Sequence, residues 1–124
     1  MDEKEKREIA DKMLKAIEAR YGMIPLVNKV LSENPDIFIP TVNMSKAVFE
    51  SEDKKLDART TYLCAVSAAT ALGAEHCIRV QGSHAKAAGV SKEEMLEAMM
   101  IGSCMAMTRA QSYAFRVLED LYKE

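Results

Sequence analysis

Residues 73–84, GAEHCIRVQGSH, include the side chains of this chain that are best suited to chemistry. Cys77 falls in the first turn of a predicted helix, where unpaired amides and the helix dipole stabilise a thiolate. The thiolate is the reactive form of cysteine. His76 and Arg79 add positive charge beside it. Cys77 is therefore either a nucleophile or a small buried hydrophobic residue, and its neighbours in the sequence leave both interpretations open.

Cys77, Gln81 and His84 share one face of that predicted helix. Seven residues span about 10.5 Å at 1.5 Å per residue, so His84 lies too far along the helix to deprotonate Cys77 directly. Gln81 lies one turn away, but an amide does not act as a base at neutral pH. We therefore predict that His84 contacts a neighbouring helix or subunit. Glu75 is interpreted as a first-turn acid that complements the helix dipole.

The other two cysteines, Cys64 and Cys104, lie in apolar helical stretches and are predicted to be core residues, although either could approach Cys77 in the fold. A metal site built from the three cysteines, His76 and His84 would require three helices to converge, and no paired-ligand spacing supports it. The sequence therefore predicts no metal and no cofactor.

The composition indicates one helical domain spanning residues 1–124. The chain is 48% hydrophobic and 29% charged, with five glycines and three prolines. It is too apolar for a disordered chain and too poor in turn-forming residues for an all-β protein. Its net charge of −2 argues against nucleic-acid binding. Neither a signal peptide nor an apolar run of about 20 residues is evident, so we expect a cytoplasmic protein that has no membrane partner and keeps its thiols reduced.

Hydrophobic periodicity predicts about six helices. They cover residues 5–19, a short second helix that starts at Pro25 and stops before Asn34-Pro35, then 36–50, 58–72, 74–88 and a last segment that starts at 91 and has a break near 102–108. Asp57 is a good N-cap for the fourth helix, and Gly89 is a left-handed C-cap for the fifth. Residues 91–94, SKEE, form a capping box. The fourth helix is rich in small residues, which let another helix approach closely, so we predict that it lies at the centre of the fold. The methionines are predicted to fill gaps in the core.

From about residue 21 onward, the chain resembles the carboxymuconolactone decarboxylase and alkylhydroperoxidase D-like family. The resemblance rests on the IP before a short helix, on NPDIF, and above all on the stretch LDARTTYLCAVSAATALGAEHCIRVQGSHAKAAGVSKEEMLEAM. It implies an all-α, alkylhydroperoxidase D-like helical fold. It also implies a homo-oligomer, commonly a trimer or hexamer, with which the many Met and Ala residues on helix faces are consistent.

The redox branch of this family carries a glutamate on the fourth helix and a C-x-x-C-x-x-x-H motif at the start of the fifth. In this chain the glutamate position holds Tyr62, the first cysteine position Ala74, the second Cys77 and the histidine position Gln81. In the family mechanism the second cysteine attacks, the glutamate and histidine relay protons, and the first cysteine closes the disulfide. Only the attacking thiol is retained, with His76 as the candidate substitute base.

The resemblance implies a thiol-dependent peroxide or disulfide redox protein, an antioxidant with peroxiredoxin activity. The expected site comprises catalytic Cys77 and His76, with pocket residues Tyr62, Gln81, His84 and Cys64. Its partners would be a small-molecule substrate and a thiol reductant, which is either an external thiol or one of the other two cysteines. One alternative is a catalytically lapsed small-molecule binding or scaffold oligomer. Another is a lactone decarboxylase, although Gln81 again replaces the histidine of that branch.

Overall fold

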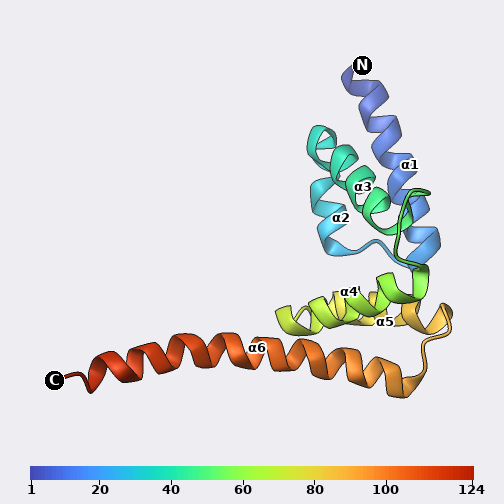
Figure 1. The fold of residues 1–124 in the computed structure, drawn as a ribbon. Helices are drawn as coiled ribbons and strands as arrows, with labels where there is room; N and C mark the ends of the chain where they lie inside the picture. Colours follow the sequence, from blue (N-terminus) through green and yellow to red (C-terminus); the bar gives the residue numbers. More distant parts are fainter. The chain divides into compact units, whose positions relative to one another are not determined.

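The computed structural model describes all 124 residues and contains six helices and no strand (Figure 1). The helices are α1 (Glu3–Tyr21), α2 (Leu26–Leu31), α3 (Pro35–Glu50), α4 (Ala58–Leu72), α5 (Glu75–Ala87) and α6 (Lys92–Leu121). The predicted all-α fold class is therefore confirmed. The chain divides into two compact units, Met1–Lys54 with α1 to α3 and Lys55–Glu124 with α4 to α6.

In the first unit, α3 packs against both α1 and α2. Phe38 of α3 and Ala10 of α1 are fully buried. At one end an ion pair of 2.8 Å joins Lys6 of α1 to Asp36 of α3, and at the other Arg20 pairs with Glu50. A buried apolar centre and two charged ends thus hold α1 and α3 together.

In the second unit, α4 is the central helix, as predicted, because it packs against both α5 and α6. The core of this unit comprises Val66, Ala85, Val90 and Ala98, with Tyr62, Leu63, Met95 and Met99 packed against it. Asp57 caps α4 by accepting a hydrogen bond of 2.7 Å from the Thr60 amide. Gly73 (φ 67°) ends α4, and Gly89 (φ 89°) follows α5, both in the left-handed conformation.

The methionines are mostly exposed, contrary to the prediction that they fill the core. Met95 and Met99 do pack against the core. More than half of the surface of each of the others named here is exposed: Met23, Met44, Met100, Met105 and Met107. Periodicity identified apolar faces correctly, but several of these faces have no neighbour within the chain.

α6 runs for 30 residues without interruption, so the predicted break near residues 102–108 is wrong. The predicted capping box begins the helix: the Glu94 amide donates to Ser91 Oγ at 3.1 Å, and the Ser91 amide donates to Glu94 Oε1 at 3.0 Å. In the expected break, the hydroxyls of Ser103 and Thr108 donate to carbonyl oxygens one turn earlier. These polar residues therefore fit within the helix.

Gly102 is buried where α6 meets α4, and its lack of a side chain sets how closely the two helices approach. A Cβ atom at this position would lie 2.2 Å from the carbonyl oxygen of Ser67 and 3.2 Å from Cβ of Thr70. The first neighbour is backbone, which cannot rotate away. Only glycine permits this packing of α4 on α6.

The Arg59 guanidinium of α4 pairs with Glu94 of α6. The hydrogen bond from Arg59, together with that from the Ser91 amide, lowers the pKa of Glu94 from 4.5 to about 2. The ion pair therefore links the start of α4 to the start of α6 and favours the charged form of the carboxyl group.

We expect Gly102→Ala to lower the free energy of unfolding by about 1–3 kcal/mol, because the added methyl group overpacks the contact between α4 and α6. Gly82→Ala is the matched control, since Gly82 lies within α5 and a Cβ there meets nothing within 4 Å. That control should raise the free energy of unfolding by about 0.5–1 kcal/mol. Urea unfolding of the full chain measures both, and equal changes for the two variants would contradict the close approach.

Glu94→Gln should lower stability at neutral pH but retain the capping hydrogen bond to Ser91, which glutamine also makes. Because folding lowers the pKa of Glu94, its contribution is fully present above about pH 4.5 and is lost as pH falls towards 2. The variant should therefore lose less stability than the wild type over this interval. Urea midpoints measured from pH 7 to pH 2 test this, with Glu93→Gln as the control. Parallel pH profiles for wild type and Glu94→Gln would rule out the ion pair as the cause.

Candidate functional site

The predicted site residues lie on the hairpin formed by α4 and α5 (Figure 1). Tyr62 of α4 stacks on His84 of α5, with ring centroids 5.1 Å apart and an angle of 30° between the rings. His84 thus makes a contact with a neighbouring helix, as predicted. The antiparallel register set by this pair places Cys77, two turns earlier in α5, level with Ala69 of α4.

Cys77 is the third residue of α5, and its thiol is free and exposed. Its predicted place in the first helical turn is confirmed, whereas the alternative interpretation as a buried hydrophobic residue is wrong. His76, the preceding residue, is also exposed. Glu75 pairs with Arg79 at 3.6 Å on the exposed surface of the same helix. The surroundings of Cys77 therefore comprise solvent, helix-terminal amides and these exposed polar groups.

Cys64 and Cys104 are also free and exposed, so the prediction that they are core residues is wrong. Cys64 shares a face of α4 with Ala68 and Leu72, both of which are exposed as well. Cys104 points away from the α6 face that carries the buried Gly102, because two residues along a helix rotate the side chain by about 200°. Both thiols lie on apolar helix faces that no other helix of the second unit covers.

Two buried oxygen atoms on the hairpin have no hydrogen-bond partner: Oε1 of Gln81 and Oγ1 of Thr61. Gln81 lies one turn beyond Cys77 and one turn before His84, on the same face of α5. A buried acceptor of this kind costs about 1–3 kcal/mol unless a bound molecule supplies a donor. Sequence reasoning predicted Gln81 as a pocket residue, which stays a prediction, and it did not single out Thr61. The residue type alone does not show whether a threonine hydroxyl has a partner, since Thr70 in the same helix donates a hydrogen bond of 2.8 Å to the Val66 carbonyl oxygen whereas Thr61 has no partner.

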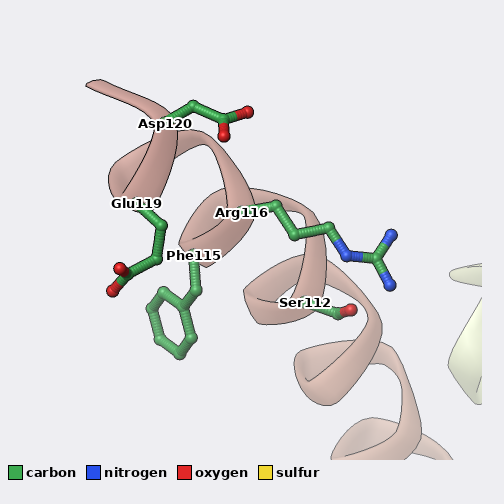
Figure 2. A pocket seen from close by; sticks show the side chains of 5 residues that line it. All are labelled: Ser112, Phe115, Arg116, Glu119 and Asp120. Atoms are coloured by element: carbon green, nitrogen blue, oxygen red, sulfur yellow. The ribbon is translucent and has the colours of Figure 1, made fainter. Parts of the chain in front are cut away.

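The remaining features of the surface lie elsewhere. A shallow hollow runs along the C-terminal part of α6 and is lined by Ser112, Phe115, Arg116, Glu119 and Asp120 (Figure 2). These residues all belong to one helix, and none is a predicted site residue. No group of three or more His, Cys, Asp and Glu side chains is arranged to hold a metal ion. None of the six helices is both long and apolar enough to cross a membrane.

In comparison with known proteins, residues 35–120 match the family described as the carboxymuconolactone decarboxylase family. The matched segment contains α3, α4, α5 and all but the last residue of α6. No curated protein and no solved structure matches the chain.

Replacing the unpartnered polar groups should stabilise the protein in the absence of ligand. We expect Gln81→Met and Thr61→Val each to raise the free energy of unfolding by about 1 kcal/mol, because each removes a buried oxygen that has no donor. Thr70→Val is the matched control and should lower it by about 1 kcal/mol, since that hydroxyl is bonded. Urea unfolding distinguishes these cases. A loss of stability in Gln81→Met would mean that the amide oxygen has a partner in the folded protein.

Proposed function

Because this chain belongs to the carboxymuconolactone decarboxylase family, we propose that it is a thiol-dependent redox protein in which Cys77 reduces a small peroxide with electrons from an external thiol. The observation that carries the proposal is the free, exposed thiol of Cys77 in the first turn of α5. This is the position that the attacking cysteine occupies in the redox branch of the family.

The proposed reaction begins when the Cys77 thiolate attacks one peroxide oxygen. An S–O bond forms as the O–O bond breaks, which leaves a sulfenic acid on Cys77 and, after protonation, an alcohol or water. One external thiol then attacks the sulfenic sulfur, giving a mixed disulfide and releasing water. A second external thiol attacks that disulfide, which regenerates the Cys77 thiol and releases the oxidised reductant as a disulfide. Two thiols thus supply the two electrons that the peroxide accepts.

The reductant is external in this proposal because Ala74 occupies the position of the resolving cysteine. The amides of the first turn of α5 favour a thiolate on Cys77. His76 is the proposed proton-transfer group. Consecutive side chains on a helix point about 100° apart, so we assign His76 a role that acts through solvent and not through a direct contact with the sulfur.

The alternative function is a lapsed enzyme that binds a small molecule or acts as a scaffold, and one observation favours binding. Gln81 Oε1 is buried and has no hydrogen-bond partner, and it lies one turn from His84, which stacks on Tyr62. A ligand with a hydrogen-bond donor and a flat apolar part would satisfy that oxygen and pack against the rings. In this case Cys77 would have no catalytic role.

The proposed setting of the protein follows from the same resemblance. We propose a homo-oligomer, a trimer or a hexamer, located in the cytoplasm, where low-molecular-weight thiols keep cysteines reduced. Such thiols are also the class of reductant that the proposed reaction requires.

Cys77→Ala should abolish peroxide consumption above the uncatalysed background, because it removes the only proposed nucleophile. The assay follows loss of hydrogen peroxide in the presence of excess dithiothreitol. Cys104→Ala is the matched control, since that thiol is also free and exposed, and it should keep the wild-type rate. Intact mass after peroxide treatment without reductant should show one added oxygen in the wild type, localised to Cys77.

Equal rates for wild type and Cys77→Ala would overturn the proposal. So would a wild-type rate no higher than the background. In either case, a small molecule that stabilises the wild type but not Gln81→Met would support the binding alternative.

A further inference from the structure

α6 is apolar on two faces, and only one of them is covered within the second unit. The covered face packs against α4 and holds Ala98 and Gly102, which are buried, with Met95 and Met99 partly buried beside them. The second face is a row of eight residues, all exposed: Leu96, Met100, Ser103, Met107, Ala110, Ala114, Val117 and Leu121. We refer to this row as the α6 stripe.

The spacing of the α6 stripe is that of a helix that pairs with another helix. Its members alternate at intervals of four and three residues without a single exception from Leu96 to Leu121. These are the a and d positions of a heptad, whose 3.5-residue repeat keeps a narrow seam facing one partner helix. Other exposed apolar residues of α6, among them Ile101, Phe115 and Leu118, lie outside this row.

The C-terminal part of α6 has no packing partner within the second unit. Residues 107–124 are all exposed, and this part of the helix continues beyond the α4–α5 hairpin (Figure 1). An isolated helical segment of about 15 residues is marginal in water, and most helices in proteins owe their stability to packing of an apolar face. Figure 2 shows Ser112, Arg116 and Glu119 on this segment together with Phe115, and none of these residues belongs to the stripe.

The surface area of the chain is large enough to supply an interface. The chain exposes 9315 Å². The two units account for roughly 6 and 8 kDa of the 13.8 kDa chain. Two compact proteins of these masses would together expose roughly 8000 Å² of solvent-accessible surface. The excess of roughly 1300 Å² exceeds the roughly 800 Å² that each partner buries in an interface of standard size.

We propose that the α6 stripe packs against the α6 stripe of a second copy of this chain. A second copy carries the same heptad spacing, so side chains at a and d of one helix fit between those of the other. A patch that is complementary to itself is also what a two-fold dimer requires. Within the stripe, Ser103, Ala110 and Ala114 are small and allow the helices to approach closely, while the larger members supply apolar area.

This inference rests on the homo-oligomer proposed above and assigns a surface to its hexameric form, because pairing of identical stripes requires an even number of chains. It is independent of the proposed redox chemistry, because no member of the stripe belongs to the candidate site. The paired helices would form one type of contact within the oligomer.

The test compares single substitutions on the two sides of α6. Met107→Glu and Val117→Glu place a charge in the stripe, whereas Ser112→Glu adds the same charge outside the stripe on the same helix. Sedimentation velocity over a range of protein concentrations, with reductant present to exclude disulfide-linked species, gives the mass. We expect wild type and Ser112→Glu to be oligomeric with similar dissociation constants. Each stripe variant should dissociate at about tenfold higher concentration or more.

Far-UV circular dichroism compares each variant with wild type diluted until it dissociates, because the end of α6 is expected to lose helix when its partner leaves. The uncharged Met107→Gln replaces any glutamate variant that loses more helical signal than the dissociated wild type. If the wild type is oligomeric and every stripe variant has the same mass as the wild type, the α6 inference is overturned but the homo-oligomer proposal remains intact. A monomeric wild type would overturn both.

Discussion

The contact between Gly102 and the Ser67 carbonyl is the constraint on which the second unit depends. It brings α6 against α4 at a separation that no side chain at residue 102 would permit. α4 also packs against α5. It therefore sets the position of α5, with which it forms the hairpin that carries the candidate site, and the position of α6. Because the backbone of α4 itself forms one side of the contact, the position of α6 cannot be adjusted by rotation of a side chain. The site geometry and the direction of α6 therefore have a common origin.

Local signals in the sequence predicted the helices well, because the groups that start and end a helix act over three or four residues. Asp57, Ser91 with Glu94, and Gly89 each form the cap or turn that their type and spacing indicate. The error at residues 102–108 has a physical cause, since glycine both weakens an isolated helix and permits close packing. At Gly102 close packing is the deciding effect, because the residue lies against the carbonyl oxygen of Ser67, which is 35 residues earlier in the chain. Sequence periodicity alone does not identify that neighbour.

The candidate site was predicted in part. The place of Cys77 in the first turn of α5 and the contact of His84 with a neighbouring helix both follow from helical spacing. The exposure of Cys64 and Cys104 does not follow from helical spacing. An apolar stretch shows which face of a helix avoids water, but it does not show whether another element covers that face. The same ambiguity explains the exposed methionines. Thr61 was missed because a threonine with a bonded hydroxyl and one without look alike in a sequence.

The carboxylate of Glu94 uses its two oxygens for two different helices. Oε1 accepts from the Ser91 amide at the start of α6, and Oε2 accepts from Arg59 in the first turn of α4. Fraying of either helix start would remove a contact that the other also uses, so the two starts form one cooperative element within the unit. Their backbone amides would then exchange with solvent in a common opening event, although 35 residues separate Arg59 from Glu94 in the chain. The Glu94 side chain thereby couples the local unfolding of the first turns of α4 and α6, which are distant in the sequence.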